Sequence, residues 1–98
     1  MEIKIKAINF DATEKLQEFT TKKVEKLAKS YDIQKVEVQL KVVKPATAQN
    51  KATSMSTQVL GTPVFVEKTY DTFEQGIDEC IDALKVQMTK IKEKNRNH

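Results

Sequence analysis

Two stretches near the N-terminus alternate between polar and apolar side chains. Residues 2–8 place Ile3 and Ile5 between charged neighbours, and residues 36–42 place Val36, Val38 and Leu40 between polar ones. A period of two brings alternate side chains onto opposite sides of an extended chain. Both stretches are therefore predicted to be β-strands with one buried and one solvated face.

Two other stretches repeat their apolar residues with helical spacing. The first begins after Asp11 or Thr13, either of which could be the N-cap, and runs to about Ser30. The second begins after Asp71 or Thr72 and runs from about residue 72 to residue 94. Its apolar residues form one narrow stripe, which is typical of a helix packed against a core: Phe73, Ile77, Cys80, Ile81, Leu84, Met88 and Ile91.

The middle of the chain has weaker signals. Residues 44–51 read as a loop because they contain Pro45, Thr47 and Asn50. Residues 52–60, rich in Thr, Ser, Met and Val, are predicted to form a strand of low hydrophobicity. A turn is expected at residues 61–63, followed by a strand at residues 64–66.

The element order is thus β-α-β-β-β-α, an α+β fold. A strand–helix–strand crossover makes the first two strands parallel, whereas the short later connections make an antiparallel meander. Both helices follow strands that run in one direction, so they should be roughly parallel on one face of a four-stranded mixed sheet, as in double-stranded-RNA-binding domains. We expect one domain over residues 1–94 and a frayed tail over residues 95–98.

Composition narrows the possible classes of protein. A chain of 98 residues with 39% hydrophobic and 32% charged residues is expected to form one globular domain. Its single cysteine excludes an intramolecular disulfide and a cysteine-rich zinc site. No apolar run approaches the roughly 20 residues of a membrane span. We therefore expect a cytoplasmic protein with no membrane partner, metal or cofactor.

The charge pattern changes this picture more than the net charge of +3 does. Residues 72–84 carry four acids and no base, whereas residues 85–98 carry five bases and one acid, and the first helix is likewise acidic at its start and basic at its end. Such a pattern in one helix is often only a complement to the helix macrodipole. Because the topology brings both basic ends together, it also predicts a surface that binds a polyanion.

Other candidate chemistry is weak. Cys80 lies on the apolar stripe, where a buried hydrophobe is the simpler interpretation, and the only histidine, His98, is the last residue. Asp78 and Asp82 fit a solvated helix face. The sheet face away from the helices, which includes Lys4, Lys6, Glu37, Gln39 and Lys41, offers only Phe65 for stacking bases, and Phe65 could equally be buried.

At this level of detail the chain resembles the short bacterial ribosome hibernation-promoting factors, also called ribosome-associated inhibitors. The resemblance is carried by two sets of residues at matching spacing, while residues 45–60 match poorly. In the first helix the set is Thr13, Glu14, Leu16, Phe19, Lys23, Lys26 and Leu27. In the second helix it is Ile77, Asp78, Ile81, Asp82, Leu84, Gln87, Met88, Thr89, Lys90, Lys92 and Lys94.

The resemblance implies binding to the small ribosomal subunit and its rRNA, in the channel of mRNA and the A- and P-site tRNAs, with translation blocked by occupancy and ribosome dimers as a further outcome. It implies no small-molecule substrate, and we expect a monomer when the protein is free. The candidate rRNA contacts include four added from the charge pattern (Lys22, Lys29, Lys85 and Arg96). The full set is Lys22, Lys23, Lys26, Lys29, Lys85, Lys90, Lys92, Lys94 and Arg96.

Three alternatives stay open from the sequence. The chain could be a general double-stranded RNA-binding module without ribosome specificity. It could be an interaction domain whose charges only keep it in solution. The third is an acylphosphatase-like enzyme, which is disfavoured because that chemistry needs an Arg cradle and the single Arg lies near the C-terminus.

Overall fold

The expected order of elements is present in the computed structural model, which describes residues 1–31, 33–43 and 49–96. The chain alternates between strands and helices as predicted. The elements are β1 (Glu2–Ile8), α1 (Glu14–Tyr31), β2 (Lys35–Val42), β3 (Lys51–Val59), β4 (Thr62–Tyr70) and α2 (Phe73–Arg96). None of the helices in these ranges is long and apolar enough to cross a membrane.

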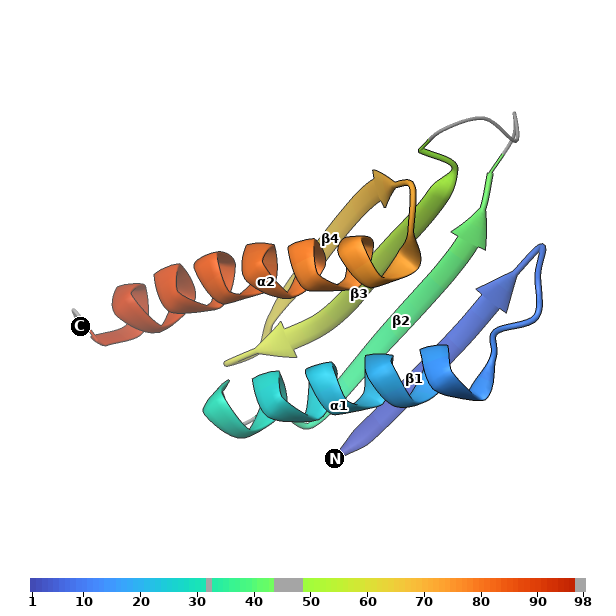
Figure 1. The fold of residues 1–98 in the computed structure, drawn as a ribbon. Coiled ribbons are helices and arrows are strands. Elements are labelled where there is room, and N and C mark those ends of the chain that lie inside the picture. The colour runs from blue at the N-terminus through green and yellow to red at the C-terminus, as the bar shows by residue number, and fades with distance from the viewer. Residues whose placement is uncertain (32, 44–48, 97–98) are drawn as a thin grey trace.

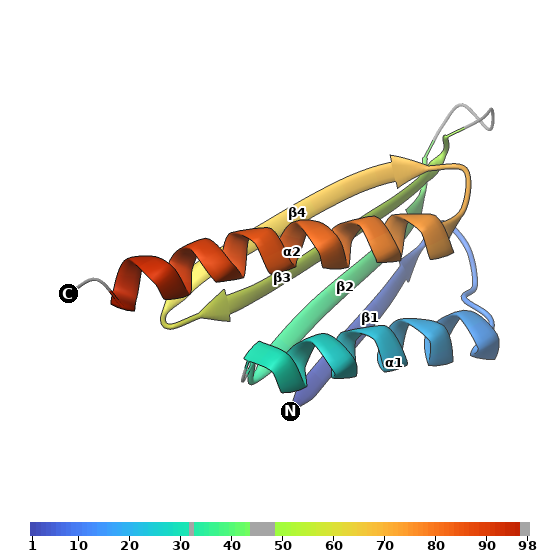
Figure 2. The same cartoon turned by 60° about the vertical axis from the view of Figure 1, so that its left-hand side comes forward.

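The four strands form one mixed sheet in the order β1-β2-β3-β4. β1 pairs with β2 in parallel, and the two later pairs are antiparallel. Both helices lie on the same face of the sheet and run in the same direction, α1 over the β1–β2 side and α2 over the β3–β4 side (Figures 1 and 2). The predicted α+β architecture with roughly parallel helices is therefore confirmed.

The core lies between this face of the sheet and the two helices. Val36, Val38 and Leu40 of β2 are buried, as the alternation predicts, and they belong to the same cluster as Val24 of α1 and Leu84 of α2. Burial of such side chains contributes roughly 1.5–3 kcal/mol each. The stripe on each helix therefore fixes which of its sides faces the sheet, and with it which side faces water.

Each helix begins at one of the two caps that the sequence allowed. The Thr13 hydroxyl accepts a hydrogen bond from the backbone N–H of Leu16 (3.1 Å), and the Thr72 hydroxyl accepts one from the N–H of Gln75 (3.2 Å). Thr13 and Thr72 are therefore the N-caps. The Asp71 carboxylate instead accepts a hydrogen bond from the N–H of Gln49.

The structure corrects two predicted boundaries. The β3–β4 turn contains only Leu60 and Gly61, both with positive φ (52° and 80°), so Thr62 already belongs to β4, which continues to Tyr70. The polar residues at the end of β4 concealed this length, because an edge strand does not need a hydrophobic outer side. Helix α2 ends at Arg96, two residues later than predicted. Residues 44–48 of the predicted loop, and residues 97–98 of the predicted tail, lie outside the described ranges.

Close packing of α2 against β3 explains Gly76, which sits inside the second helix despite its poor helix propensity. A Cβ atom on Gly76 would lie 2.6 Å from the Thr53 hydroxyl oxygen. That oxygen is buried and has no hydrogen-bond partner among the described residues. Gly76 therefore allows the helix backbone to approach the sheet closely.

Candidate nucleic-acid interface

Three lysines form an exposed stripe along the outer side of α1. Lys22, Lys26 and Lys29 are all exposed, whereas Val24 and Leu27 on the same turns are buried against the sheet. At about 100° per residue, the three lysines lie on the side of the helix opposite the core. This stripe presents positive charge directly to solvent, as the sequence predicted.

Lys23 differs from this stripe because it faces α2. Its Nζ lies 3.2 Å from an Asp78 carboxylate oxygen of α2 and 5.4 Å from the centroid of the Phe19 ring. The Lys23 and Asp78 side chains remain 44% and 51% exposed, so the pair is solvated and adds little to stability. Lys23 is therefore available to a phosphate only in competition with Asp78.

A second link between the helices lies near the end of α1. The Tyr31 hydroxyl is 3.2 Å from the Thr89 hydroxyl, and the Lys92 Nζ lies 4.9 Å from the centroid of the Tyr31 ring. A cation over an aromatic face is attracted by the ring quadrupole. Tyr31 thus holds the charged end of Lys92 beside the C-terminus of α1.

These contacts define the axial offset of the helices. Lys23 lies beside Asp78, and Tyr31, the last residue of α1, lies beside Thr89 and Lys92. Residues 93–96 of α2 therefore continue past the end of α1, and the C-terminal end of α2 extends beyond the sheet (Figures 1 and 2). The two helices point the same way, as predicted. Their basic ends overlap at Tyr31 and Lys92, and α2 continues about one turn beyond the end of α1.

The α2 lysines divide between two flanks of that helix. Asp78, Lys85 and Lys92 are seven residues apart, so Lys85 lies on the side that contacts α1. Lys90 and Lys94 are about 160° away around the helix and line a shallow hollow with Ile91 and Glu93. The predicted cations are thus divided into a set on the outer side of α1 and along the contact between the helices, and a separate pair on the far flank of α2. Arg96 is the last residue of α2.

We call the first set the basic surface. It consists of Lys22, Lys23, Lys26, Lys29, Lys85 and Lys92, all exposed or partly exposed. The acids of α1 (Glu14, Glu18 and Glu25) fall on the flank away from α2. Glu18 and Glu25 lie one turn before Lys22 and Lys29, so they partly offset the charge of those two lysines. Lysines act on phosphates as point charges, without the forked geometry of Arg that reads bases. The basic surface is therefore suited to a nucleic-acid backbone rather than to a sequence.

Two other titratable groups of the described residues, Cys80 and Tyr70, have raised pKa values. Cys80 is fully buried and its Sγ lies 3.3 Å from the Thr53 carbonyl oxygen, to which the thiol donates. Burial raises the pKa of the Cys80 thiol to about 11, so it is protonated and unreactive at neutral pH. Partial burial and then the neighbouring Glu79 carboxylate raise the pKa of Tyr70. Among the described residues, His, Cys, Asp and Glu side chains do not gather in groups of three that could hold a metal.

Comparison with known families accounts for nearly the whole chain. Residues 3–96 match the sequence profile of the family described as Sigma 54 modulation protein / S30EA ribosomal protein. The chain belongs to this family. The match spans both helices and all four strands. The family description names no enzyme activity.

Solved structures show that the S30EA family fold is shared across most of the chain. A ribosomal subunit interface protein from Coxiella burnetii superposes with a TM-score of 0.82 at 19% identity, covering 95% of this chain and 99% of that one. The N-terminal domain of Thermus thermophilus Protein Y superposes with a TM-score of 0.75 at 22% identity, covering 93% and 99%. No curated protein sequence matches the chain. The resemblance to ribosome hibernation-promoting factors is confirmed at the level of family and fold.

Two residues of this S30EA family chain have a role that its sequence does not predict. Asp78 fits a solvated helix face by sequence, and Tyr31 follows the predicted end of the first helix, yet each links α1 to α2. The spacing of Asp78, Lys85 and Lys92 by seven residues was a signal that these three share a flank. No signal in the sequence indicated that this flank, rather than the one with Lys90, faces α1.

Proposed function

We propose that this protein binds the small ribosomal subunit through the basic surface on α1 and α2. In this proposal, the protein occupies the channel of mRNA and the A- and P-site tRNAs and blocks translation by occupancy. Membership of a family described as containing ribosomal proteins supports a ribosomal partner. The observation that carries the choice of surface is the parallel placement of two neighbouring helices, each of which exposes lysines to solvent beside the other.

The charge of the basic surface predicts how binding responds to salt. Each phosphate that a lysine neutralises releases condensed counterions, so the affinity falls steeply as salt rises. With about five phosphate contacts, raising salt from 50 to 200 mM should weaken binding by roughly 10²- to 10³-fold. Binding should discriminate poorly between sequences, because the contacts are to the backbone.

Co-sedimentation with purified small subunits tests the surface directly. We expect the double variant Lys26→Glu/Lys85→Glu to lose binding, because it places two acids where phosphates would lie. The matched control is Lys4→Glu/Lys6→Glu, which makes the same change of net charge at two exposed positions on β1, away from the helices. Equal loss in both variants would show that net charge, rather than this surface, governs binding.

Competition tests the proposed location on the subunit. Prior loading of mRNA and initiator tRNA should reduce binding of the protein, and excess protein should inhibit cell-free translation. Sucrose-gradient profiles with and without the protein show whether ribosomes are also paired. Undiminished binding to loaded subunits would contradict the channel location. Comparable affinity for an arbitrary RNA duplex would instead support a general double-stranded RNA-binding module.

The far-flank pair can be separated from the basic surface. Lys90→Glu/Lys94→Glu changes the net charge as much as Lys26→Glu/Lys85→Glu, but on the side of α2 that faces away from α1. Comparing the two variants measures whether the RNA follows the space between the helices or wraps around the end of α2. Loss of binding only in the far-flank variant would move the proposed site to the end of α2.

A further inference from the structure

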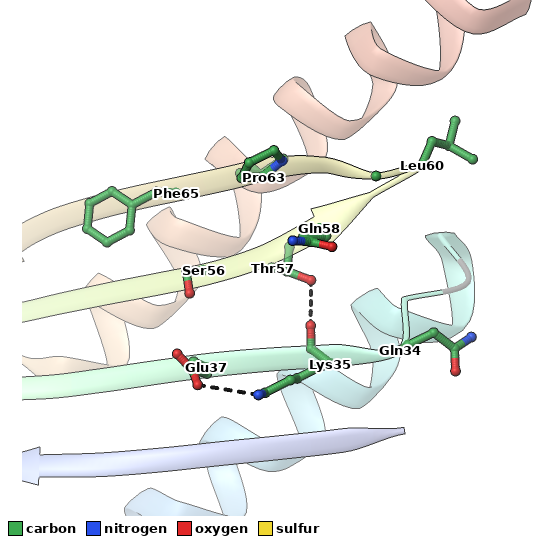
Figure 3. Close-up of a pocket in the computed structure, with 11 residues that line it drawn as sticks. Gln34, Lys35, Glu37, Ser56, Thr57, Gln58, Leu60, Pro63 and Phe65 are labelled. Atoms are coloured by element: carbon green, nitrogen blue, oxygen red, sulfur yellow. Dashed lines mark hydrogen bonds and ion pairs between the residues drawn. The ribbon is translucent and has the colours of Figure 1, made fainter.

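The sheet face opposite the helices carries an exposed aromatic residue. Phe65 of β4 is 61% exposed, and Leu60 in the adjoining turn is 65% exposed. Together with Pro63 they are spread along β4 and its turn, on one side of a shallow depression that also includes Lys35 and Glu37 (Figure 3). Exposed apolar residues along one side of a depression can mark an interaction site.

Leu60 is costly for the folded chain in two ways. Its φ of 52° is left-handed, a conformation that favours Gly, Asn or Asp in a two-residue hairpin turn. Its side chain is also left in water. Neither feature stabilises the fold, so contact with a partner is a reason for a large apolar residue at this position.

Two neighbouring rows of side chains cross the strands at this depression. The strand register pairs Glu2 with Lys35 and Gln58 with Pro63 in one row. In the next row it places Lys4, Glu37, Ser56 and Phe65 side by side. Each row therefore carries one acid and one base, and the two rows together have no net charge.

We propose that this face binds a second copy of the same chain through a two-fold axis between the two rows. Such an axis, lying in the interface and across the strands, exchanges the rows. It sets Lys35 against the partner's Glu37, Glu2 against the partner's Lys4, and Pro63 against the partner's Phe65. Every opposition is favourable, which is the self-complementarity that an isologous interface requires.

The balanced charge favours a second copy over RNA at this face. A polyanion gains from an excess of cations, which the basic surface has and these two rows lack. Leu60 and Pro63 also add apolar contact that a phosphate backbone does not use. Like charges at the same positions would repel a second copy, whereas here each acid meets a base.

The size of the face predicts a weak dimer. The whole sheet face measures about 25 by 20 Å, but the axis crosses the strands near one end, so two copies share about half of it and bury roughly 500 Å² in total. That area is below the range of stable specific interfaces, so the complex should be weak and transient. The expectation of a monomer therefore applies to dilute protein, and a dimer should appear as the concentration rises.

Such a dimer would have its helices on both outer sides, because they cover the other face of each sheet (Figures 1 and 2). If the proposed function is right, one dimer would then present two basic surfaces to two separate RNA partners. The self-association itself is independent of RNA. It can therefore fail or succeed without deciding the proposed function.

Sedimentation equilibrium of the full chain without RNA, from micromolar to millimolar concentration, tests the interface. We expect reversible dimerisation, weakened at least tenfold by Phe65→Thr, which keeps a strand-forming residue at an exposed position. Val86→Thr, at an exposed apolar position on α2, is the matched control and should dimerise like the wild type. Wild-type protein that stays monomeric at millimolar concentration would overturn the proposal, as would a dimer that Phe65→Thr leaves unchanged.

Charge exchange tests the two-fold pairing. Lys35→Glu and Glu37→Lys should each be monomeric alone, because each opposes like charges across the axis. When mixed in equal amounts they should form a heterodimer, since the two acids of one chain then face the two lysines of the other across the interface. Absence of that heterodimer, with the wild type still dimeric, would reject this axis. A single-stranded oligonucleotide that binds the wild type but not Phe65→Thr, without any dimer, would assign the face to RNA instead.

Discussion

Lys23 of α1 and Asp78 of α2, which are 55 residues apart in the chain, form an ion pair of 3.2 Å between the two helices. The pair places the acidic first half of α2 beside the basic second half of α1. Tyr31 and Lys92 form a second contact between the helices, about two turns further along α1. The basic surface is therefore interrupted by one acid, and its lysines do not all have the same freedom to meet a phosphate.

Removal of the Asp78 charge should strengthen RNA binding. In Asp78→Asn the Lys23 ammonium loses its carboxylate partner and one fewer acid repels the phosphates, so we expect several-fold tighter binding to small subunits. The salt dependence should steepen by about one unit of slope, as for one added phosphate contact. Stability should change by less than about 1 kcal/mol because the pair is exposed.

Glu79→Gln is the matched control for Asp78→Asn. It removes one acid from the same turn of α2, on a flank turned about 100° away from Asp78. If Glu79→Gln tightens binding as much as Asp78→Asn does, the effect is one of net charge. In that case the Lys23–Asp78 pair does not regulate the surface.

Gly76→Ala should destabilise the fold although it improves helix propensity. Alanine gains about 1 kcal/mol over glycine within a helix. Here, however, the new Cβ would lie 2.6 Å from the Thr53 hydroxyl oxygen, and overpacking of this kind typically costs about 1–3 kcal/mol. We expect a lower urea midpoint, and a smaller loss when Gly76→Ala is made in a Thr53→Ala background. Equal losses in both backgrounds would show that the contact with Thr53 is not the cause.

Stability should fall in alkaline solution because of Cys80. The pKa of the thiol is raised from 9.0 to about 11 in the folded protein, so the unfolded chain ionises first as pH rises. The corresponding stability is fully present below about pH 9 and is lost by about pH 11. A difference of this size amounts to about 2–3 kcal/mol. Urea unfolding from pH 8 to pH 11.5 should show a steeper decline in the wild type than in Cys80→Ala, and parallel curves would contradict the prediction.

Leu60→Asn should stabilise the monomer. Asparagine adopts positive φ more readily than leucine and is preferred in two-residue hairpin turns, so we expect a gain of about 0.5–1 kcal/mol. The variant also removes an apolar side chain that is 65% exposed, so it loses little buried area. Thermal unfolding of dilute protein measures the change, and an unchanged or lower melting temperature would mean that Leu60 packs favourably in the monomer.

The elements of this fold could be predicted from short-range patterns. Alternation in residues 36–42 and the stripe from Phe73 to Ile91 each specify one buried face. The two candidate N-caps of each helix include the one that the structure shows, Thr13 for α1 and Thr72 for α2. The end of β4 was missed because its outer residues are polar. The turn was predicted at residues 61–63 but lies at residues 60–61. Leu60 has a left-handed backbone conformation there, which a leucine in the sequence does not indicate.

The sequence alone determined the family, the α+β topology, the side of each helix that meets the sheet, and the gathering of lysines toward the ends of the helices. These follow from periodicity and connection length, which act within a few residues. Only the tertiary structure decided that Lys85 and Lys92 face α1 while Lys90 and Lys94 do not, and that Phe65 is exposed. The axial offset and rotation of two packed helices depend on contacts between residues far apart in the chain, such as Tyr31 with Thr89, and no local pattern records them.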